Sequence, residues 1–478
     1  MSDDLGSDFL QLASSDLPVR GRAEHLTALM RAAVADGRLR TGVALPSSRR
    51  LAAELGLSRG VVVEVYRRLA DEGLVEGRTG VGTVITARPG RRGPAAPRET
   101  APPADGGASP VLPPTGDASV LDLSPGVPDL AAFPREAWLR AERTVLAEAG
   151  PLDLGYGEPR GHERLRVELA SYLGRMRGVR IGSEDVMVVA GVAQALALLS
   201  QVLRAGGLRS VAVEDPGSRG VRDEVAHWGL RPVGVPVDAD GLDVGALAAT
   251  EESVVVTTPA HQFPTGVVLS PARRRELLAW ADERQGLVVE DDYDAEHRYD
   301  RPPVPALHAS APDRVAHTGS TSKSLAPGLR LGWLLAPTRL RPALLAARHA
   351  SDIAAPALPQ LVLADLLASG AYERHLRAVR VRQRRRRDAV VETVRDRRPD
   401  LTVEGVAAGL HLLVRLPAHL DDIAVAEALR EAGLRVQPLS WHRQADGPPG
   451  LIIGYAAHPP DRLREAITRL LATIPRRP

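Results

Sequence analysis

The stretch "TGSTSKSLAPGLRLGW" occupies residues 318–333 and contains Lys323, the only lysine among 478 residues. All the other basic residues are arginines. Both side chains carry a positive charge, but only a lysine amine loses its proton readily and attacks a carbonyl carbon. Drift of lysine to arginine would leave one lysine here by chance, whereas a need for a nucleophilic amine would retain it. The neighbouring sequence has to decide between these two explanations.

Composition excludes several classes of protein. The length predicts two to four domains, because a domain usually holds roughly 100–200 residues. The chain has no cysteine, which excludes disulfides, thiolate metal sites and cysteine nucleophiles, and we expect no metal site. The N-terminus lacks a secretory signal pattern, and no apolar run reaches the roughly 18 residues of a membrane span. We therefore expect a soluble, cytoplasmic protein. The net charge of +2 means that any DNA binding depends on a local patch.

A stretch rich in proline and glycine, residues 89–120, has no apolar periodicity and predicts a linker. It separates an N-terminal unit, residues 18–88, from a large unit, residues 121–478. The N-terminal unit shows a helical pattern, then two short helices joined across Gly56, then a hairpin over residues 75–85. This order predicts a winged helix-turn-helix whose second short helix enters the DNA major groove.

Serine and arginine side chains lie near the starts of the two short helices and on the wing, where they suit DNA phosphates. The candidate DNA contacts are Ser48, Arg49, Arg50, Ser58, Arg59, Arg67 and Arg78. Ser47 or Ser48 fits the first N-cap and Ser58 the second. The alternative is a small helical domain whose arginines only face solvent. The stretches "LPSSRRLAAELGLSRG" (45–60) and "VYRRLADEGLV" (65–75) resemble the GntR family of bacterial regulators, although Val61 stands where that family often has threonine.

The large unit alternates β-branched runs with helical patterns, which predicts an α/β architecture with a mostly parallel sheet. The expected strands are 186–190, 211–214, 254–258, 287–291 and 331–336. Ligands of such sheets bind beyond the carboxyl ends of the strands. Asp291, Asp292 and Tyr293 end one strand, and Lys323 follows "RVAHTGSTS". The turn and helix start of "AGVAQALALL" (190–199) suit an anion. An amine, an acid, a phenol and an anion site are the parts that a pyridoxal phosphate site needs.

Four stretches of the large unit carry a resemblance to a known family. They are "LGYGEPRGHERLRVELASYL" (154–173), "TPAHQFPTG" (258–266), "EDDYDAEHRYDRPPVPALH" (290–308) and the opening stretch. They resemble the fold-type I aminotransferases that depend on pyridoxal 5'-phosphate (PLP), and most closely the aminotransferase-like domain of the MocR subfamily of GntR regulators. The resemblance implies a small α+β winged helix-turn-helix domain joined by a linker to a large α/β fold-type I aminotransferase-like domain that binds PLP.

The resemblance also implies roles for individual residues. Lys323 would be the catalytic residue that forms the Schiff base, Asp291 would pair with the pyridine nitrogen and Tyr293 with the ring oxygen. The phosphate ligands would be Ser320, Ser322, Arg330 and the backbone N–H groups of Val192 and Ala193. Tyr156 would reach the cofactor phosphate of the neighbouring subunit, and His261 lies in the loop that contacts the ring. The residue types alone also allow Asp291 and Asp292 in a solvated acidic loop, Tyr293 in the core, and the serines as turn residues.

Two functions remain open. One is a transcriptional regulator that senses PLP or a PLP–amine adduct and controls vitamin B6 or amino-acid and amine metabolism. The other is a working aminotransferase with an accessory DNA-binding domain. Transaminases of this fold usually clamp the substrate carboxylate with a C-terminal arginine, where "LIIGYAAH" (451–458) has Ile452. Nearby Arg435 is a possible substitute. The missing clamp favours the regulator, in the branch of the subfamily whose effector is PLP itself.

Three further expectations follow. The resemblance implies a homodimer with a head-to-tail, domain-swapped arrangement on a double-stranded DNA operator. Ser218 stands where the family often has an aromatic residue that stacks near the cofactor. The arginine run "RVRQRRRRD" (380–388) is expected to be a solvated helix face, with a contact to DNA or to another domain as the alternative.

Overall fold

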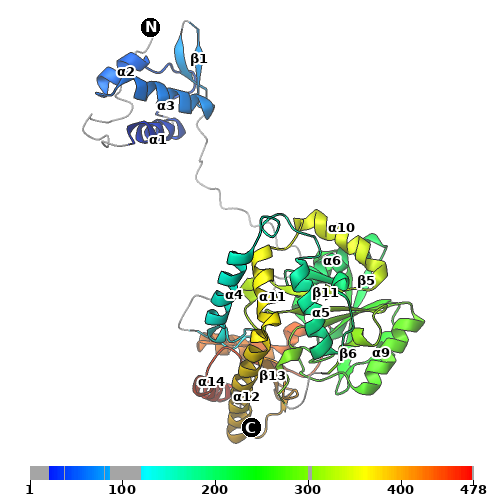
Figure 1. Cartoon of the computed structure of the whole chain (residues 1–478). Coiled ribbons are helices and arrows are strands. Elements are labelled where there is room, and N and C mark those ends of the chain that lie inside the picture. The colour runs from blue at the N-terminus through cyan, green and yellow to red at the C-terminus, as the bar shows by residue number, and fades with distance from the viewer. Residues whose placement is uncertain (1–20, 37, 80, 87–119, 300–303, 476–478) are drawn as a thin grey trace. The chain divides into compact units, whose positions relative to one another are not determined.

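The computed structural model describes residues 21–36, 38–79, 81–86, 120–299 and 304–475. The chain separates into two compact units, residues 1–105 and 106–478, and each is described by itself (Figure 1). The predicted linker, residue 120 excepted, lies outside the described residues, so the predicted boundaries at 88 and 121 stay predictions. Among the described helices, none is both long enough and apolar enough to cross a bilayer.

The N-terminal unit packs three helices against a two-stranded wing. Its elements are α1 (Arg22–Ala35), α2 (Ser48–Glu54), α3 (Arg59–Asp71), β1 (Val75–Arg78) and β2 (Gly82–Ile85). The apolar faces of the helices meet in one core that includes Leu26, Met30, Leu51, Val62 and Val65. The strands β1 and β2 are antiparallel, and a bridge from Ala44 to Val84 joins the wing to the segment before α2. This is the predicted winged helix-turn-helix.

The large unit is built on an eight-stranded sheet in the order β4-β11-β10-β9-β8-β5-β6-β7. The strands are β4 (Val186–Val189), β5 (Ser210–Asp215), β6 (Arg231–Asp238), β7 (Gly241–Leu242), β8 (Val254–Thr257), β9 (Leu287–Asp292), β10 (Val315–Ser320) and β11 (Gly332–Leu335). The central strands β5, β8, β9 and β10 run parallel, and β11 is antiparallel to both of its neighbours. All five predicted strands are present. The strands β6, β7 and β10 of this sheet were not predicted.

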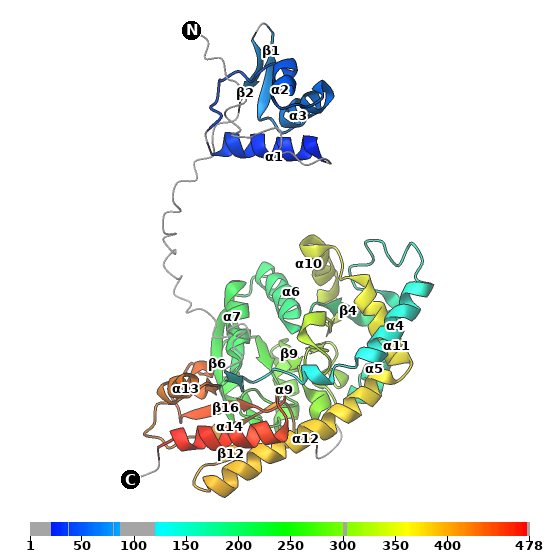
Figure 2. The same cartoon turned by 90° about the vertical axis from the view of Figure 1, so that its left-hand side faces the viewer.

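Helices cover both faces of this sheet. Val186 and Val188 of β4 pack in the core shared with α5 and α11, whereas Met187 and Val189 pack towards α6 and α10. The helices are α4 (Arg135–Glu148), α5 (Glu163–Arg177), α6 (Val192–Ala205), α7 (Arg219–His227), α8 (Val244–Ala248), α9 (Pro271–Glu283), α10 (Arg341–Asp352) and α11 (Ala357–Ala368). Figure 2 shows α4 beside α11, on the side away from β6. A mostly parallel sheet buried on both faces confirms the predicted α/β class.

The C-terminal part forms a smaller layer. A four-stranded sheet, in the order β12-β13-β16-β15, packs against helices. The elements of this C-terminal part are α12 (Ala371–Arg397), β12 (Val403–Glu404), β13 (His411–Arg415), α13 (Asp422–Glu431), β14 (Leu434–Arg435), β15 (Gln437–Pro438), β16 (Gly450–Gly454) and α14 (Pro460–Thr473). In both views α14 lies along α12 (Figures 1 and 2). The first strand of the unit, β3 (Leu121–Asp122), pairs in parallel with β14, so the start of the large unit is tied to its end.

The arginine run on α12 is only partly a solvated face. Arg384 and Arg385 are exposed, as expected. Arg386 is buried and forms an ion pair with Asp129 at 2.8 Å, and Arg382 pairs with the same carboxylate at 2.8 Å. The expectation of a solvated face was therefore wrong for Arg386, whereas Arg382 is exposed as expected although it also pairs with Asp129. Their charge serves to hold the segment around Asp129 against α12.

Candidate cofactor site and DNA-binding surface

A cavity of about 800 Å³ opens where the carboxyl ends of β9 and β10 meet the N-terminus of α6. Eight of the ten predicted cofactor residues line it, namely Val192, Ala193, Asp291, Tyr293, Ser320, Ser322, Lys323 and Arg330. Tyr156 and His261 are not among the lining residues. The volume lies within the range of roughly 300–1,000 Å³ that is usual for small-molecule and cofactor pockets.

Lys323 lies three residues after the end of β10 and points at the loop that follows β3. Its Nζ donates a hydrogen bond to the carbonyl oxygen of Gly126 at 2.6 Å. Burial lowers the pKa of Lys323 below its usual value, although the charges of Asp294 and Asp291 oppose this shift. A lower pKa raises the fraction of neutral amine, which is the form that attacks a carbonyl. The position of the lone lysine in the cavity and its lowered pKa suit a nucleophile.

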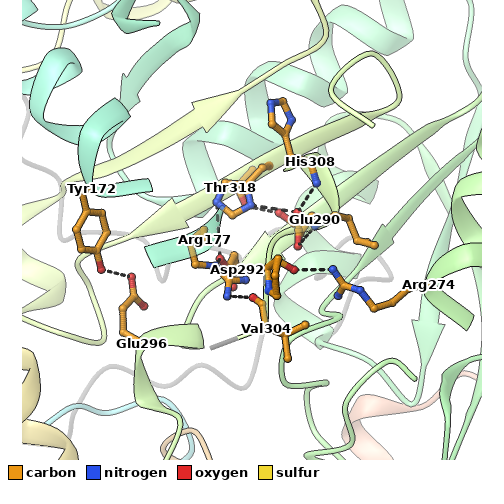
Figure 3. A network of polar contacts seen from close by, with 12 residues as sticks. Tyr172, Arg177, Arg274, Glu290, Asp292, Glu296, Val304, His308 and Thr318 are labelled. Carbon is orange, nitrogen blue, oxygen red and sulfur yellow. Dashed lines mark hydrogen bonds and ion pairs between the residues drawn. The ribbon is translucent and has the colours of Figure 1, made fainter. Parts of the chain in front are cut away.

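Four buried carboxylates lie at the end of β9, in residues 290–294. Three of them have a basic partner, namely His317 for Glu290 at 3.2 Å, Arg177 for Asp292 at 2.7 Å and His261 for Asp294 at 2.9 Å. Figure 3 shows the contacts of Glu290 and Asp292 within a wider polar network. Burial alone would raise the pKa of Glu290, but His317 and Arg177 lower it to about 2. These three carboxylates are thus held against basic side chains, whose charges oppose the effect of burial on the carboxylate pKa values.

Asp291 differs from its three neighbours because no described residue hydrogen-bonds to its side chain, and its Oδ1 is buried. Burial raises the pKa of Asp291 to about 7, and repulsion from Asp292, Asp294 and Glu214 adds to the shift. A buried carboxylate without a partner is costly unless a ligand supplies a proton or a positive charge. A protonated pyridine nitrogen supplies both. The alternative of a solvated acidic loop is excluded, since Asp291 and Asp292 are both buried.

Tyr293 borders the cavity, and His261 lies behind it. The Tyr293 hydroxyl donates to the His261 carbonyl oxygen at 3.1 Å and is 3.2 Å from His261 Nδ1. His261 in turn contacts Asp294. His261 therefore does not line the cavity itself but contacts two residues that do, Tyr293 and His411. The sequence interpretation missed Asp294, although the last aspartate of "DDYD" was a visible signal.

An anion cradle forms at the N-terminus of α6. The N-cap Gly191 has φ 87°, a left-handed conformation, and a Cβ there would lie 3.3 Å from Arg330 Nη1. Glycine thus lets the guanidinium approach the helix start. The Ser320 and Ser322 hydroxyls are 2.7 Å apart beside it. A helix N-terminus, an arginine and two hydroxyls suit a phosphate, so the residues present fit the group that PLP carries.

Other residues that line the cavity were not individually singled out by the sequence interpretation. They include Ser124, Gly126, Phe263, His411, Gln437 and His442. Ile452, at the expected position of a carboxylate clamp, is fully buried among Leu413, Leu439 and Phe263 and does not line the cavity. Arg435 does line it. Ser218 also lines the cavity and caps α7, accepting from the Val221 N–H at 3.4 Å.

The predicted DNA-binding residues divide into free and paired arginines. Arg49 and Arg59, at the starts of α2 and α3, are exposed and have no ion-pair partner among the described residues. The other three are paired, namely Arg50 with Glu54, Arg67 with Glu64 and Asp71, and Arg78 with Glu76. Of the two serines considered for the N-cap of α2, Ser47 is the cap, and Ser48 is the first residue of the helix. Ser58 occupies the N-cap of α3 without a side-chain cap bond.

Comparison with known proteins agrees with both units. Residues 22–85 match the family described as bacterial regulatory proteins, gntR family, and residues 118–470 match aminotransferase class I and II. The chain is 36% identical to the HTH-type pyridoxine biosynthesis transcriptional regulator PdxR of Corynebacterium glutamicum, over 93% of this chain and 94% of that protein. It is 30% identical to the probable rhizopine catabolism regulatory protein MocR of Rhizobium meliloti, over 95% and 94%. The chain belongs to the MocR subfamily of GntR regulators.

This MocR-type regulator shares its large unit with true aminotransferases. LysN, an alpha-aminoadipate aminotransferase from Thermus thermophilus solved with N-(5'-phosphopyridoxyl)-L-leucine, superposes with a TM-score of 0.68 at 26% identity, over 75% of this chain and 92% of that one. The chain is thus a transcriptional regulator in which a DNA-binding GntR domain is joined to a fold-type I aminotransferase domain, and the cofactor of that domain is PLP.

Replacing the unpartnered carboxylate tests the electrostatics of this MocR-type site. The pKa of Asp291 rises from 3.8 to about 7 on folding, so this group lowers stability progressively as the pH rises between these values. Asp291→Asn should therefore raise the melting temperature of the cofactor-free protein at both pH values, and clearly more at pH 8 than at pH 5, where only part of the penalty is present. The same substitution should weaken PLP binding by roughly tenfold or more, because a charge-assisted hydrogen bond is lost.

The matched control is Asp292→Asn, which removes the partner of buried Arg177 and should lower the melting temperature at pH 8. Thermal unfolding at the two pH values, and PLP titration followed by absorbance, give the measurements. A lower melting temperature for Asp291→Asn at pH 8 would contradict the assignment of an uncompensated charge.

The division into free and paired arginines predicts unequal effects on DNA binding. Arg59→Ala should weaken binding to a mixed-sequence duplex and reduce the salt slope of the affinity by about one, as expected for one lost phosphate contact. Arg67→Ala should do less, because Glu64 and Asp71 already neutralise that guanidinium. Fluorescence anisotropy over a range of salt concentrations compares the two variants. Equal losses, or a larger loss for Arg67→Ala, would show that the ion pairs do not decide which arginines contact DNA.

Proposed function

We propose that this regulator senses PLP, or an adduct of PLP with an amine, through a Schiff base between PLP and Lys323. The observation that carries the proposal is that the only lysine, the unpartnered Asp291 and the anion cradle of α6 line one cavity. PLP supplies an electrophilic aldehyde, a ring nitrogen that takes a proton, and a phosphate. Asp291 would hold the ring nitrogen, Tyr293 the ring oxygen, and the phosphate would bind to Ser320, Ser322, Arg330 and the N–H groups of Val192 and Ala193.

A sensor is favoured over an efficient aminotransferase by the apolar residue at the clamp position. Ile452 is fully buried and cannot bind a carboxylate, so the arginine clamp that transaminases of this fold usually have at this position is missing. The names of the relatives PdxR and MocR refer to pyridoxine biosynthesis and to rhizopine catabolism, and we infer a regulated pathway in vitamin B6 or amine metabolism for this chain. Effector binding would act by shifting the population between DNA-binding states.

We also propose that the regulator is a homodimer, with a head-to-tail arrangement in which the DNA-binding units are exchanged. Tyr156 is 85% exposed, and its neighbours Leu152 and Leu154 are 93% and 60% exposed. Leu146 on α4 is exposed beside them in sequence. A run of exposed apolar side chains marks an interaction surface. A second copy of this chain would cover it and receive Tyr156 at its own cofactor phosphate.

Substitution of Lys323 tests the sensor. Wild-type protein should show a new visible absorption band with PLP and a changed affinity for DNA selected by the full-length protein from random sequence. Lys323→Ala should lose both responses. Lys323→Arg, which keeps the charge but cannot form the Schiff base, should lose both as well. A PLP-dependent change of DNA affinity in either variant would contradict the proposal, and sustained keto-acid production from an amino acid by the wild type would favour an aminotransferase.

The shared site is tested by mixing two variants. Tyr156→Ala should weaken PLP binding by roughly tenfold, the effect of losing one hydrogen bond to a charged group. Lys323→Ala should form no covalent adduct. In a mixed dimer, the Tyr156→Ala chain keeps its lysine and receives Tyr156 from its partner, so one tight site should reappear. Titration of an equimolar, refolded mixture measures that site. Wild-type affinity in Tyr156→Ala alone, or no recovery in the mixture, would show that Tyr156 does not act across subunits.

A further inference from the structure

One wall of the cavity is formed by the junction between the start and the end of the large unit. Asp122 of β3 pairs in register with Arg435 of β14, and both side chains line the cavity together with Gln437. The intervening Val436 and the preceding Leu434 are buried in the C-terminal core. Successive side chains along residues 434–437 therefore alternate between the core and the cavity. Leu434 and Val436 fix the segment to the core, and Arg435 and Gln437 face the cavity.

Not all the N–H donors of Arg435 are used by described residues. Its side chain is only 12% exposed, yet its one ion-pair contact, from Nη1 to Asp122 Oδ2, is 3.5 Å long. Its Nε is buried without a hydrogen-bond partner among the described residues. A guanidinium carries five N–H donors in a planar fork that matches a carboxylate. A largely buried arginine with a distant partner and a free donor is suited to a second anion.

Asp122 belongs to a short segment that is held at three points. The Asp122 carboxylate contacts Arg435, the Gly126 carbonyl accepts from Lys323 at 2.6 Å, and Asp129 forms an ion pair with Arg386. In sequence, this segment directly follows the predicted linker, residues 89–120. Two of the three contacts thus belong to cavity-lining residues, and the segment continues the connection to the DNA-binding unit.

We propose that Arg435 binds an anionic group of the effector, a carboxylate in the simplest case, in competition with Asp122. This inference rests on the proposed function and narrows its effector to an amine that carries a carboxylate. The phosphate of PLP has its own cradle at α6, so Arg435 serves a different group. When the effector carboxylate takes Arg435, the hold of Asp122 on β14 weakens, and the segment 121–129 that continues the linker is loosened.

Because Asp122 and the effector would compete for Arg435, substitutions of Arg435 and of Asp122 should have opposite effects on the preference for an amine that carries a carboxylate. PLP-loaded full-length protein is titrated with L-alanine and with ethylamine, which differ by the carboxylate, and each affinity is read from the absorbance change. Wild type should prefer alanine by roughly tenfold or more, the effect of one charge-assisted pair. Arg435→Gln should bring this ratio close to one. Asp122→Asn should increase the ratio, because Arg435 then has no competing carboxylate.

Controls separate this inference from simpler explanations. Arg430→Gln on α13, an exposed arginine outside the cavity, should leave the ratio unchanged, and Arg435→Lys should retain part of the preference if Arg435→Gln does not fold. Acetate, which lacks the amine, should compete with alanine in the wild type but not in Arg435→Gln. Alanine should also change the DNA affinity more than ethylamine does.

A ratio near one in the wild type, or equal losses in Arg435→Gln and Asp122→Asn, would overturn the inference and show that the ion pair is only structural. The proposed function would survive either result, provided that the PLP band is present and depends on Lys323. Absence of that band in the wild type would overturn both.

Discussion

The large unit depends on the compensation of four carboxylates buried at the carboxyl end of β9. Charge buried without a partner costs several kcal/mol, so each group constrains its surroundings. Arg177 at the end of α5 reaches Asp292, His317 on β10 reaches Glu290, and the loop that carries His261 reaches Asp294. Three separate elements are thereby fixed against one strand end. Asp291 is left without a protein partner among the described residues, and its compensation has to come from the ligand.

This arrangement links folding to binding. Glu290, Asp292 and Asp294 each have a basic partner at the end of β9, whereas Asp291, which has none among the described residues, faces the cavity that holds Lys323. The cofactor removes a cost that the folded protein bears in its absence, which is a direct way for a small molecule to stabilise one state of a regulator. The contact of Lys323 with Gly126 brings the same site into touch with the segment that continues the linker.

Local signals made the winged helix-turn-helix predictable. Caps, the turn at Gly56 and the apolar faces of α1 and α3 are all short-range features, and the structure buries the residues expected. In the sheet, strands rich in valine were predicted, whereas β10 was missed because His317, Thr318 and Ser320 are polar although fully or largely buried. Buried polar strands do not show the apolar pattern on which strand prediction relies.

The candidate site was predictable only in part. Lys323, Asp291 and Tyr293 stand beside strands with recognisable sequences, and their roles came from the resemblance to a family. The partners Arg177, His317 and Asp294 were not predicted, because charge compensation joins residues such as Arg177 and Asp292 that are 115 positions apart. Arg386 was mistaken for part of a solvated face because a run of arginines does not reveal that Asp129 lies beneath it.

The most direct test of this account is borohydride reduction of the PLP-saturated, folded protein, followed by peptide mapping by mass spectrometry. The chain offers one lysine and one N-terminal amine, so the location of a reduced adduct is unambiguous. The account predicts a phosphopyridoxyl group on the peptide that contains Lys323, at close to one per chain. An unlabelled Lys323 in folded, saturated protein would contradict it and leave only the DNA-binding half of the account standing.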